Sequence, residues 1–204
     1  MTSAKYDVLA IGNAIFDVLV QTDDAFLAAH QMNKGGMALI DEARAKAIYD
    51  AMGPATEMSG GSAANTVVGL ASLGASVAYV GKVKDDQIGA LYTHDIRSAG
   101  VSYLTKPAAA GPATGCSYIL VTPDGERTMN TYLGAAQDLT PEDIDPAAIA
   151  ASQYVYLEGY LWVRPVPRRL SSRPPRSPTT PAAKWRLLCR IRSASVAIAA
   201  NFSI

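Results

Sequence analysis

Gly60-Gly61-Ser62-Ala63-Ala64-Asn65 is the stretch of sequence that decides the fold. The two glycines lead directly into a segment whose apolar residues repeat at helical spacing, and Gly74 is placed to end that helix. Because glycine has no Cβ, a ligand can approach the free N–H groups at the start of such a helix. The stretch therefore predicts a strand–turn–helix unit with a small-molecule site for hydroxyl or anionic groups.

Strand and helix patterns alternate along the chain around this unit. Short apolar runs at 8–12, 76–80 and 153–157 are typical of buried strands, and the periodicity of 62–73 and 86–99 is typical of helices. Such alternation predicts an α/β fold in which helices cover the faces of a parallel sheet.

Other segments predict a hairpin and a further strand and helix. Pro123-Asp124-Gly125 is a turn sequence between two strand patterns, so residues 115–133 are expected to form a β-hairpin. A short strand is expected at 36–40. Asp41 is placed to cap a helix that runs to about Met52. The expected inner face of that helix consists of Ala43, Ala47, Ile48 and Ala51.

The composition limits the class of protein. The 204 residues are enough for one domain or for a piece of a larger one, and the longest apolar runs are too short to span a membrane. The first seven residues carry no basic targeting segment, so we expect a cytoplasmic protein without a membrane partner. Cys116 and Cys189 are the only cysteines and His30 and His94 the only histidines, so we expect neither a disulfide framework nor a metal site.

The net charge of zero hides two different halves. Residues 1–162 hold 9 basic and 18 acidic residues, whereas residues 163–204 hold 9 basic residues and no acidic ones. The second segment also has six of the twelve prolines and no glycine. This change of composition predicts a boundary after Trp162, followed by a disordered tail.

Two interpretations of the basic tail are open. Its positive charges suit a nucleic-acid or membrane-surface arm. Its abrupt onset and its excess of Arg, Pro and Ser are also what an out-of-frame reading of GC-rich DNA gives. We favour the second interpretation, and on it we expect no nucleic-acid partner.

Four motifs together resemble the PfkB, or ribokinase-like, family of sugar and nucleoside kinases. Residues 60–66 resemble the first signature of the family, and residues 12–17 its first strand and substrate turn. Residues 34–41 are similar to the lid-connecting stretch of adenosine-kinase-like bacterial members, and residues 80–89 to the GxVGxDxxG stretch.

The resemblance extends over residues 6–162. It implies that residues 1–162 are the N-terminal part of a ribokinase-like three-layer sandwich. The parallel sheet would carry a small β lid, made from residues around 13–40 and 115–133.

The same resemblance implies ATP-dependent phosphorylation of a hydroxymethyl group on a sugar or nucleoside. Asn13 and Asp17 match the family's ligands for sugar hydroxyls, and an amide and a carboxylate suit paired hydroxyls because one donates and accepts and the other only accepts. Gly60, Gly61 and Asn65 match the residues that cradle the same sugar. The start of the helix is thus expected to hold hydroxyls rather than a phosphate.

Two charged residues have alternative interpretations. Arg127 matches a family position near the substrate or the transferred phosphate, but a solvated hairpin residue is the alternative. Glu158 ends the strand at 153–157 and either faces the site or has a structural role.

The second signature of the family, Asp-Thr-x-Gly-Ala-Gly-Asp, does not occur in this sequence. In the family it supplies the general base and the N–H groups that stabilise the transferring phosphoryl group. The Asn-x-x-Glu motif linked to Mg²⁺ is also missing. The family uses ATP and Mg²⁺, but we expect this chain to have no ATP site and no catalytic residue, and to be an inactive truncated kinase.

Two further expectations follow. Without the later strands the parallel sheet would keep an unpaired edge, so we expect low solubility or dimerisation through that edge. The alternative function is a non-catalytic ligand-binding or regulatory protein with a basic nucleic-acid-binding arm.

Overall fold

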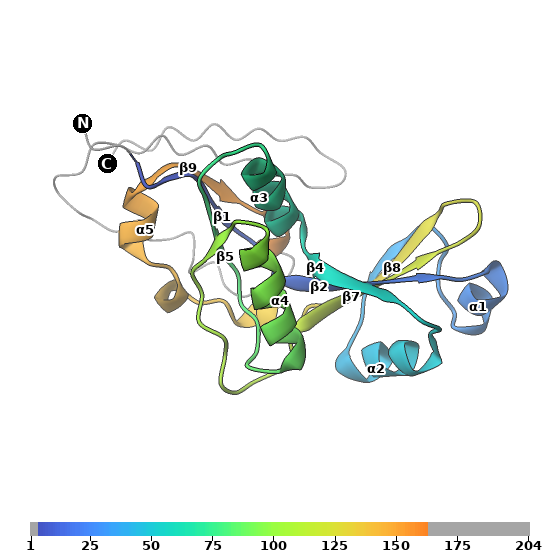
Figure 1. The fold of residues 1–204 in the computed structure, drawn as a ribbon. Helices are drawn as coiled ribbons and strands as arrows, with labels where there is room; N and C mark the ends of the chain where they lie inside the picture. The colour runs from blue at the N-terminus through green and yellow to red at the C-terminus, as the bar shows by residue number, and fades with distance from the viewer. Residues whose placement is uncertain (1–3, 163–204) are drawn as a thin grey trace.

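The computed structural model describes residues 4–162 of the chain (Figure 1). The basic tail at 163–204 lies outside the described residues, so its disorder and its origin stay predictions. Within residues 4–162 no helix is long and apolar enough to cross a membrane.

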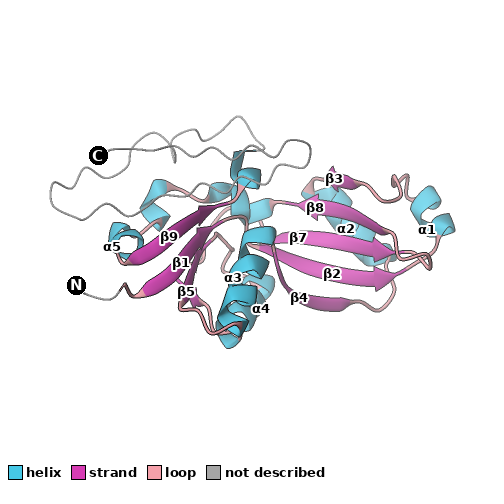
Figure 2. Ribbon diagram, turned by 90° about the horizontal axis from the view of Figure 1, so that it is seen from above, coloured by secondary structure: helices cyan, strands magenta, loops and turns pink. Residues whose placement is uncertain are grey.

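A parallel sheet forms the body of the molecule, and it confirms the predicted α/β class. Its strands, in spatial order, are β6 (Ser102–Tyr103), β5 (Val77–Val80), β1 (Tyr6–Ile11) and β9 (Ser152–Leu157). Helices α3 (Ser62–Ser72) and α4 (Gln87–Ser98) cover one face, and α5 (Pro146–Ala150) lies by β9 on the other (Figure 2).

Alternate residues of β1 supply the two cores of this layered body. Ala10 packs with Val67 of α3 and Ile96 of α4, whereas Leu9 and Ile11 pack with Ala148 of α5. Successive side chains of a strand point to opposite faces of the sheet. Both faces of β1 are therefore buried over Leu9–Ile11, which explains the apolar run Val8–Ile11 that follows Asp7.

A second, five-stranded sheet extends away from the body, and we call it the lid sheet (Figure 1). Its strands, in spatial order, are β3 (Met37–Leu39), β8 (Arg127–Tyr132), β7 (Gly115–Val121), β2 (Ile15–Gln21) and β4 (Thr56–Gly60). The predicted hairpin forms the antiparallel pair of β7 and β8. Strand β4 also belongs to this sheet, which the sequence pattern did not indicate.

Helices α1 (Asp24–Ala29) and α2 (Glu42–Ala51) lie on one face of the lid sheet, where Leu27 and Ile48 pack against its strands. The predicted inner face of α2 was wrong in three positions. Ala45 and Ile48 are the buried residues of this helix, and three of the four predicted inner residues are exposed, namely Ala43, Ala47 and Ala51. Arg44 is half-buried and its guanidinium donates to the carbonyl of His30, so the inner side of α2 includes a long polar side chain rather than more alanines.

Candidate functional site

The predicted site residues lie where the chain passes between the parallel sheet and the lid sheet. Asn13 is buried in the short turn from β1 to β2. Gly61 connects β4 to α3 and has a φ of +94°, which favours glycine. A Cβ at Gly61 would overlap the carbonyl oxygen of Asn13. Glycine is thus required here both by the backbone conformation and by the close approach of the two turns.

The carboxylate of Asp17 lies against Gly60. Strand β2 is antiparallel to β4, with Ile15 opposite Gly60 and Asp17 opposite Met58. The carboxylate of Asp17 lies in the space that a Cβ at Gly60 would need. Burial raises the pKa of Asp17 to about 6, and the positive charge of Arg127 partly opposes that rise.

Asn65 lies one helical turn further along. Its backbone N–H donates to the carbonyl of Gly61 at 2.9 Å, and its side chain is exposed on α3. The structure therefore brings Asn13, Asp17, Gly60 and Gly61 together at one junction, with Asn65 on the helix that starts there.

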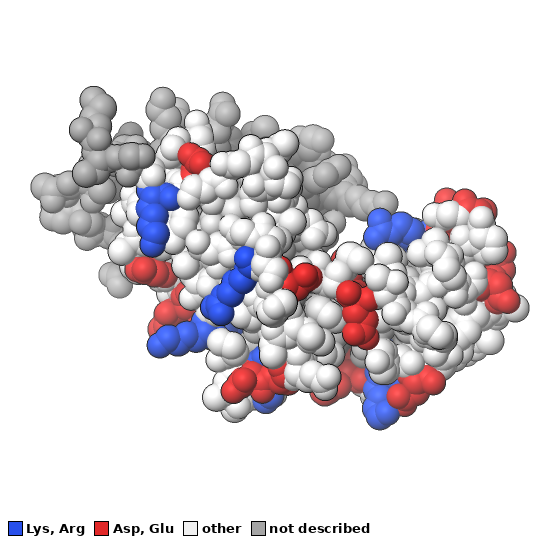
Figure 3. Space-filling model, in the orientation of Figure 1, with Lys and Arg blue, Asp and Glu red and all other residues white. Residues whose placement is uncertain are grey.

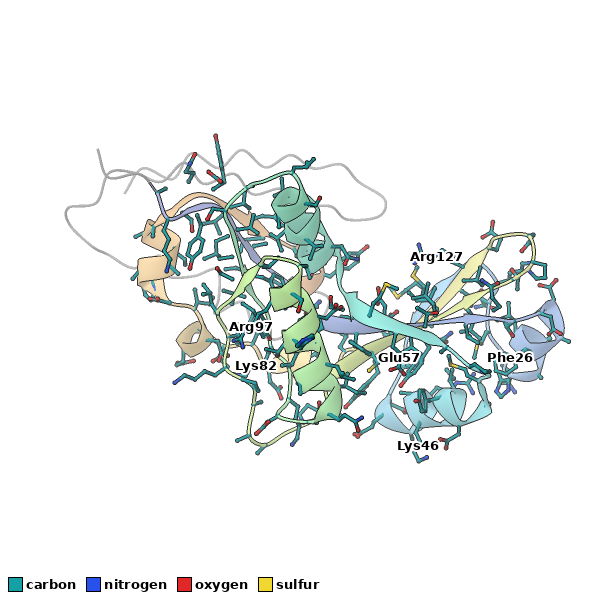
Figure 4. The ribbon with its side chains drawn as sticks, in the orientation of Figure 1. Phe26, Lys46, Glu57, Lys82, Arg97 and Arg127 are labelled. Carbon is teal, nitrogen blue, oxygen red and sulfur yellow. The ribbon has the colours of Figure 1, made fainter. Side chains whose placement is uncertain are left out.

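Arg127 lies in the lid sheet, away from the junction (Figure 4). It pairs with Val121 of β7, which pairs with Gln21 of β2, four residues beyond Asp17. The register puts Arg127 on the same face of the sheet as Asp17. The side chain of Arg127 is exposed and makes no hydrogen bond or ion pair with the residues that the structure describes, so its effect on Asp17 is one of charge at a distance.

Glu158 proves to be part of the junction. It follows β9 directly and its side chain is only 3% exposed. One carboxylate oxygen accepts from the backbone N–H of Asn13 at 2.8 Å, and the other accepts from the hydroxyl of Ser62. Burial raises the pKa of Glu158, while these hydrogen bonds and the N–H of Ala63 oppose the rise.

A sequence signal for Glu158 did exist. The ends of neighbouring parallel strands meet at the same edge of a sheet, and β9 pairs directly with β1, with Leu157 beside Ile11. Glu158 and Asn13 therefore both follow the ends of adjacent strands. Knowing that β9 is next to β1 was the missing step.

Helix α4 supports the junction from the body side. Its cap residue Asp86 accepts from the N–H and the hydroxyl of Thr114, immediately before β7, at 2.9 and 2.7 Å. Asp95 accepts from the N–H of Ser59 in β4 at 2.6 Å, and the Tyr92 hydroxyl donates to the carbonyl of Gly60 at 3.3 Å. Two strands of the lid sheet are thus tied to one helix of the body.

Among residues 4–162, no group of three or more His, Cys, Asp or Glu side chains is arranged to hold a metal ion, so we assign no Mg²⁺ ligand there. A shallow hollow lies at the far end of β2, lined by Leu19, Val20, Gln21, Gly53, Pro54 and Thr56. None of the predicted site residues lines it.

Comparison with known proteins identifies the family. The family model described as "pfkB family carbohydrate kinase" matches residues 41–173, which is more than half of the chain. The chain belongs to the pfkB family of carbohydrate kinases. The match begins after Asn13 and Asp17 and continues beyond Trp162.

Solved structures and curated relatives agree with this family. The adenosine kinase from Sinorhizobium meliloti is 56% identical, with a TM-score of 0.75, and the alignment covers 79% of this chain and 50% of that one. The ribokinase of Staphylococcus aureus is 28% identical over 73% of this chain and 45% of its own. The ATP-dependent ribose-1-phosphate kinase of Halopiger xanaduensis is 35% identical over 50% of this chain and 34% of its own.

These comparisons confirm the predicted ribokinase-like fold and the resemblance to sugar and nucleoside kinases. The chain spans about half the length of these pfkB relatives or less. Nothing in them supports the alternative of a non-catalytic protein with a nucleic-acid-binding arm. On the face drawn in Figure 3, the basic side chains of the described residues lie singly among acidic ones.

Proposed function

We propose that this chain contains the acceptor-binding part of an ATP-dependent kinase for sugars or nucleosides. The observation that carries the proposal is the contact of the Asp17 carboxylate with Gly60, next to the contact of Gly61 with Asn13. A carboxylate that accepts and an amide that both donates and accepts suit neighbouring hydroxyl groups of a sugar. Asn65 would complete this site from α3, and Arg127 would add positive charge from the lid sheet.

A nucleoside fits this site better than a free sugar does. The lid face that carries Asp17 also carries Met58 opposite it, and Met37 and Leu39 at the far edge of the same face. These three side chains are 42–46% exposed. A flat, largely apolar base bound beside the sugar would cover Met58, which lies next to Asp17, and burial of apolar surface favours binding. Met37 and Leu39 lie on the opposite edge strand, beyond the reach of a base bound beside Asp17.

The family implies ATP as phosphoryl donor, and Mg²⁺ is its expected companion. In this chain the acceptor-side residues would hold and orient the hydroxyl that is to be phosphorylated. No residue among 4–162 is assigned as its general base. Because the sequence has no Asp-Thr-x-Gly-Ala-Gly-Asp string, we propose that this polypeptide alone does not transfer the phosphoryl group. Dimerisation, a cytoplasmic location and the absence of a nucleic-acid partner stay predictions.

Calorimetric titration of the purified chain with adenosine and with ribose tests the acceptor site. We expect adenosine to bind more tightly than ribose, and Asp17→Asn to weaken adenosine binding by roughly tenfold or more. The matched control is Glu57→Gln, which removes an exposed carboxylate from β4 (Figure 4). If wild type and Asp17→Asn bind adenosine with equal affinity, Asp17 does not contribute to the acceptor site.

An assay for phosphorylated adenosine, with MgATP present, tests the second part of the proposal. The expected result is no product above a control without protein. Product above that control would show that the chain carries its own phosphotransfer machinery.

A further inference from the structure

Three buried tyrosines form one cluster behind the junction of the two sheets. Tyr79 lies in β5, Tyr92 in α4 and Tyr103 in β6, and the ring of Tyr103 is 6.0 Å from that of Tyr79 and 5.9 Å from that of Tyr92. The Tyr92 hydroxyl donates to the carbonyl of Gly60 at 3.3 Å, and the Tyr103 hydroxyl donates to the carbonyl of Gly81 at 2.6 Å. Two of the three phenols thus each hold the carbonyl of a glycine at the end of a strand.

The hydroxyl of Tyr79 is the exception in this cluster. Its side chain is fully buried, and its hydroxyl has no hydrogen-bond partner among residues 4–162. Burial raises the pKa of this phenol well above its ordinary value, so the hydroxyl keeps its proton and remains a donor. Leaving a buried donor unpaired is costly, and folded proteins nearly always pair it with another residue or with an ordered water molecule.

The carbonyl of Gly12 is a suitable acceptor near this hydroxyl. Gly12 follows β1 directly, and its carbonyl oxygen accepts no hydrogen bond from the described residues. The Tyr79 hydroxyl oxygen and the Gly12 carbonyl oxygen lie 2.7 and 2.8 Å from the point that a Cβ at Gly81 would occupy. A water molecule hydrogen-bonds to oxygens about 2.8 Å away, so one molecule can bridge two oxygens that lie this close to a common point.

The peptide group between Gly12 and Asn13 would gain a second hydrogen bond from such a bridge. Its N–H belongs to Asn13 and donates to the buried carboxylate of Glu158 at 2.8 Å. A donor at its carbonyl oxygen would hold the same peptide group from the opposite side, and hydrogen bonds that are linked through one group strengthen each other. The orientation of this peptide group determines where the chain enters Asn13.

We propose that a buried water molecule links the Tyr79 hydroxyl to the Gly12 carbonyl, and that Tyr79 thereby positions the peptide group that leads into Asn13. The hydroxyl donates to the water, and the water donates to the carbonyl oxygen. Buried waters make about three hydrogen bonds, and the hydroxyl of Tyr92, which interacts with that of Tyr79, is available as a third partner. Tyr79 is a positioning residue, because it acts through Gly12 from behind the junction. The inference does not depend on which acceptor the protein binds.

A crystal structure of the full chain, at a resolution that shows ordered water, tests the bridge directly. We expect one water molecule within hydrogen-bond distance of both the Tyr79 hydroxyl and the Gly12 carbonyl. A direct hydrogen bond from Tyr79 to Gly12 or to Tyr92, with no water between them, would overturn the proposal.

Tyr79→Phe tests the positioning role, because it removes only the hydroxyl and keeps the ring. The carbonyl carbon of Gly12 and the amide nitrogen of Asn13 belong to one peptide group, and their NMR signals report on a hydrogen bond to its oxygen. In the variant we expect both signals to shift and the melting temperature to fall, because phenylalanine cannot hold the water.

Tyr103→Phe is the matched control, because it removes a hydroxyl that holds the carbonyl of Gly81 instead. It should shift the carbonyl signal of Gly81 and leave that of Gly12 in place. A folded Tyr79→Phe variant with unchanged Gly12 and Asn13 signals would refute the positioning role. A raised melting temperature would show that the hydroxyl has no partner in the wild type. If Tyr79→Phe does not fold, the crystal structure of the wild-type chain decides.

Discussion

The carboxylate of Asp17 lies against the Cα of Gly60, in the space that any side chain at that position would fill. Asp17 belongs to β2 and Gly60 ends β4, so this contact joins two strands just where the lid sheet meets the body. The position of the carboxylate and the path of the chain into α3 therefore depend on each other.

Gly60→Ala should disturb both the position of the Asp17 carboxylate and the path of the chain into α3. The added methyl group overlaps the Asp17 carboxylate, so we expect a loss of about 1–3 kcal/mol in the free energy of unfolding and a weaker affinity for adenosine. Denaturant unfolding and calorimetric titration measure the two effects. Gly69→Ala is the matched control on α3, because nothing lies within 4 Å of its added Cβ. That change should stabilise the protein slightly through helix propensity. Equal stability of the two variants would contradict the contact.

The raised pKa of Asp17 predicts a dependence of stability on pH. The folded chain holds this proton more tightly than the unfolded chain, because the pKa is about 6 in the fold against an ordinary value of 3.8. The contribution of Asp17 to stability is therefore fully present below about pH 4 and is lost as the pH rises through 6.

Asp17→Asn, which cannot ionise, isolates this effect. Between pH 4 and 7, the difference in unfolding free energy between wild type and variant should change by on the order of 2–3 kcal/mol. Urea unfolding at several pH values measures it. If the unfolding free energies of the two proteins depend on pH in the same way, the pKa of the Asp17 carboxyl is not shifted in the fold.

Ser62→Ala removes a donor from the buried Glu158 carboxylate. We expect a loss of about 1–3 kcal/mol in stability, because a buried charged group then lacks one of its partners. Ser72→Ala, at the exposed other end of α3, removes only a bond to the carbonyl of Gly69 and should change stability by less than about 0.5 kcal/mol. Thermal melts measure the stability of both variants. An unchanged melting temperature for Ser62→Ala would contradict the hydrogen bond from Ser62 to Glu158.

Lys82 and Asp143 form an ion pair whose side chains are 14% and 12% exposed. Lys82→Ala leaves the Asp143 carboxylate without its cation, so we expect a loss of about 2–4 kcal/mol. Lys46 and Asp50 form an exposed pair on α2, and Lys46→Ala should cost about 0.5 kcal/mol or less. Denaturant unfolding at neutral pH compares the two variants. Similar losses would mean that burial does not strengthen the contribution of the Lys82 pair.

Much of the body could be predicted from the sequence, because the decisive features are local. The start of α3 follows from the two glycines and the helical spacing behind them, and β1 follows from its apolar run. The hairpin follows from the turn at 123–125, where Gly125 has a φ of +82° and its N–H donates to the carbonyl of Thr122.

The features that the sequence did not reveal depend on long-range contacts. Strand β4 joins the lid sheet through pairing with β2, about forty residues earlier, and no local pattern indicates that partner. The role of Glu158 depends on β9 lying beside β1. The inner face of α2 was misassigned because alanine is small and is found on either side of a helix, so three of the four residues used carried little information.

The three contacts from α4 to the lid side of the molecule have a mechanical consequence. Asp86 holds the beginning of β7, near the middle of the lid sheet, while Asp95 holds β4 at its edge. One helix of the body therefore holds two of the five strands of the lid sheet. A tilt of α4 would move both strands together, so the orientation of the lid sheet relative to the parallel sheet depends on this one helix.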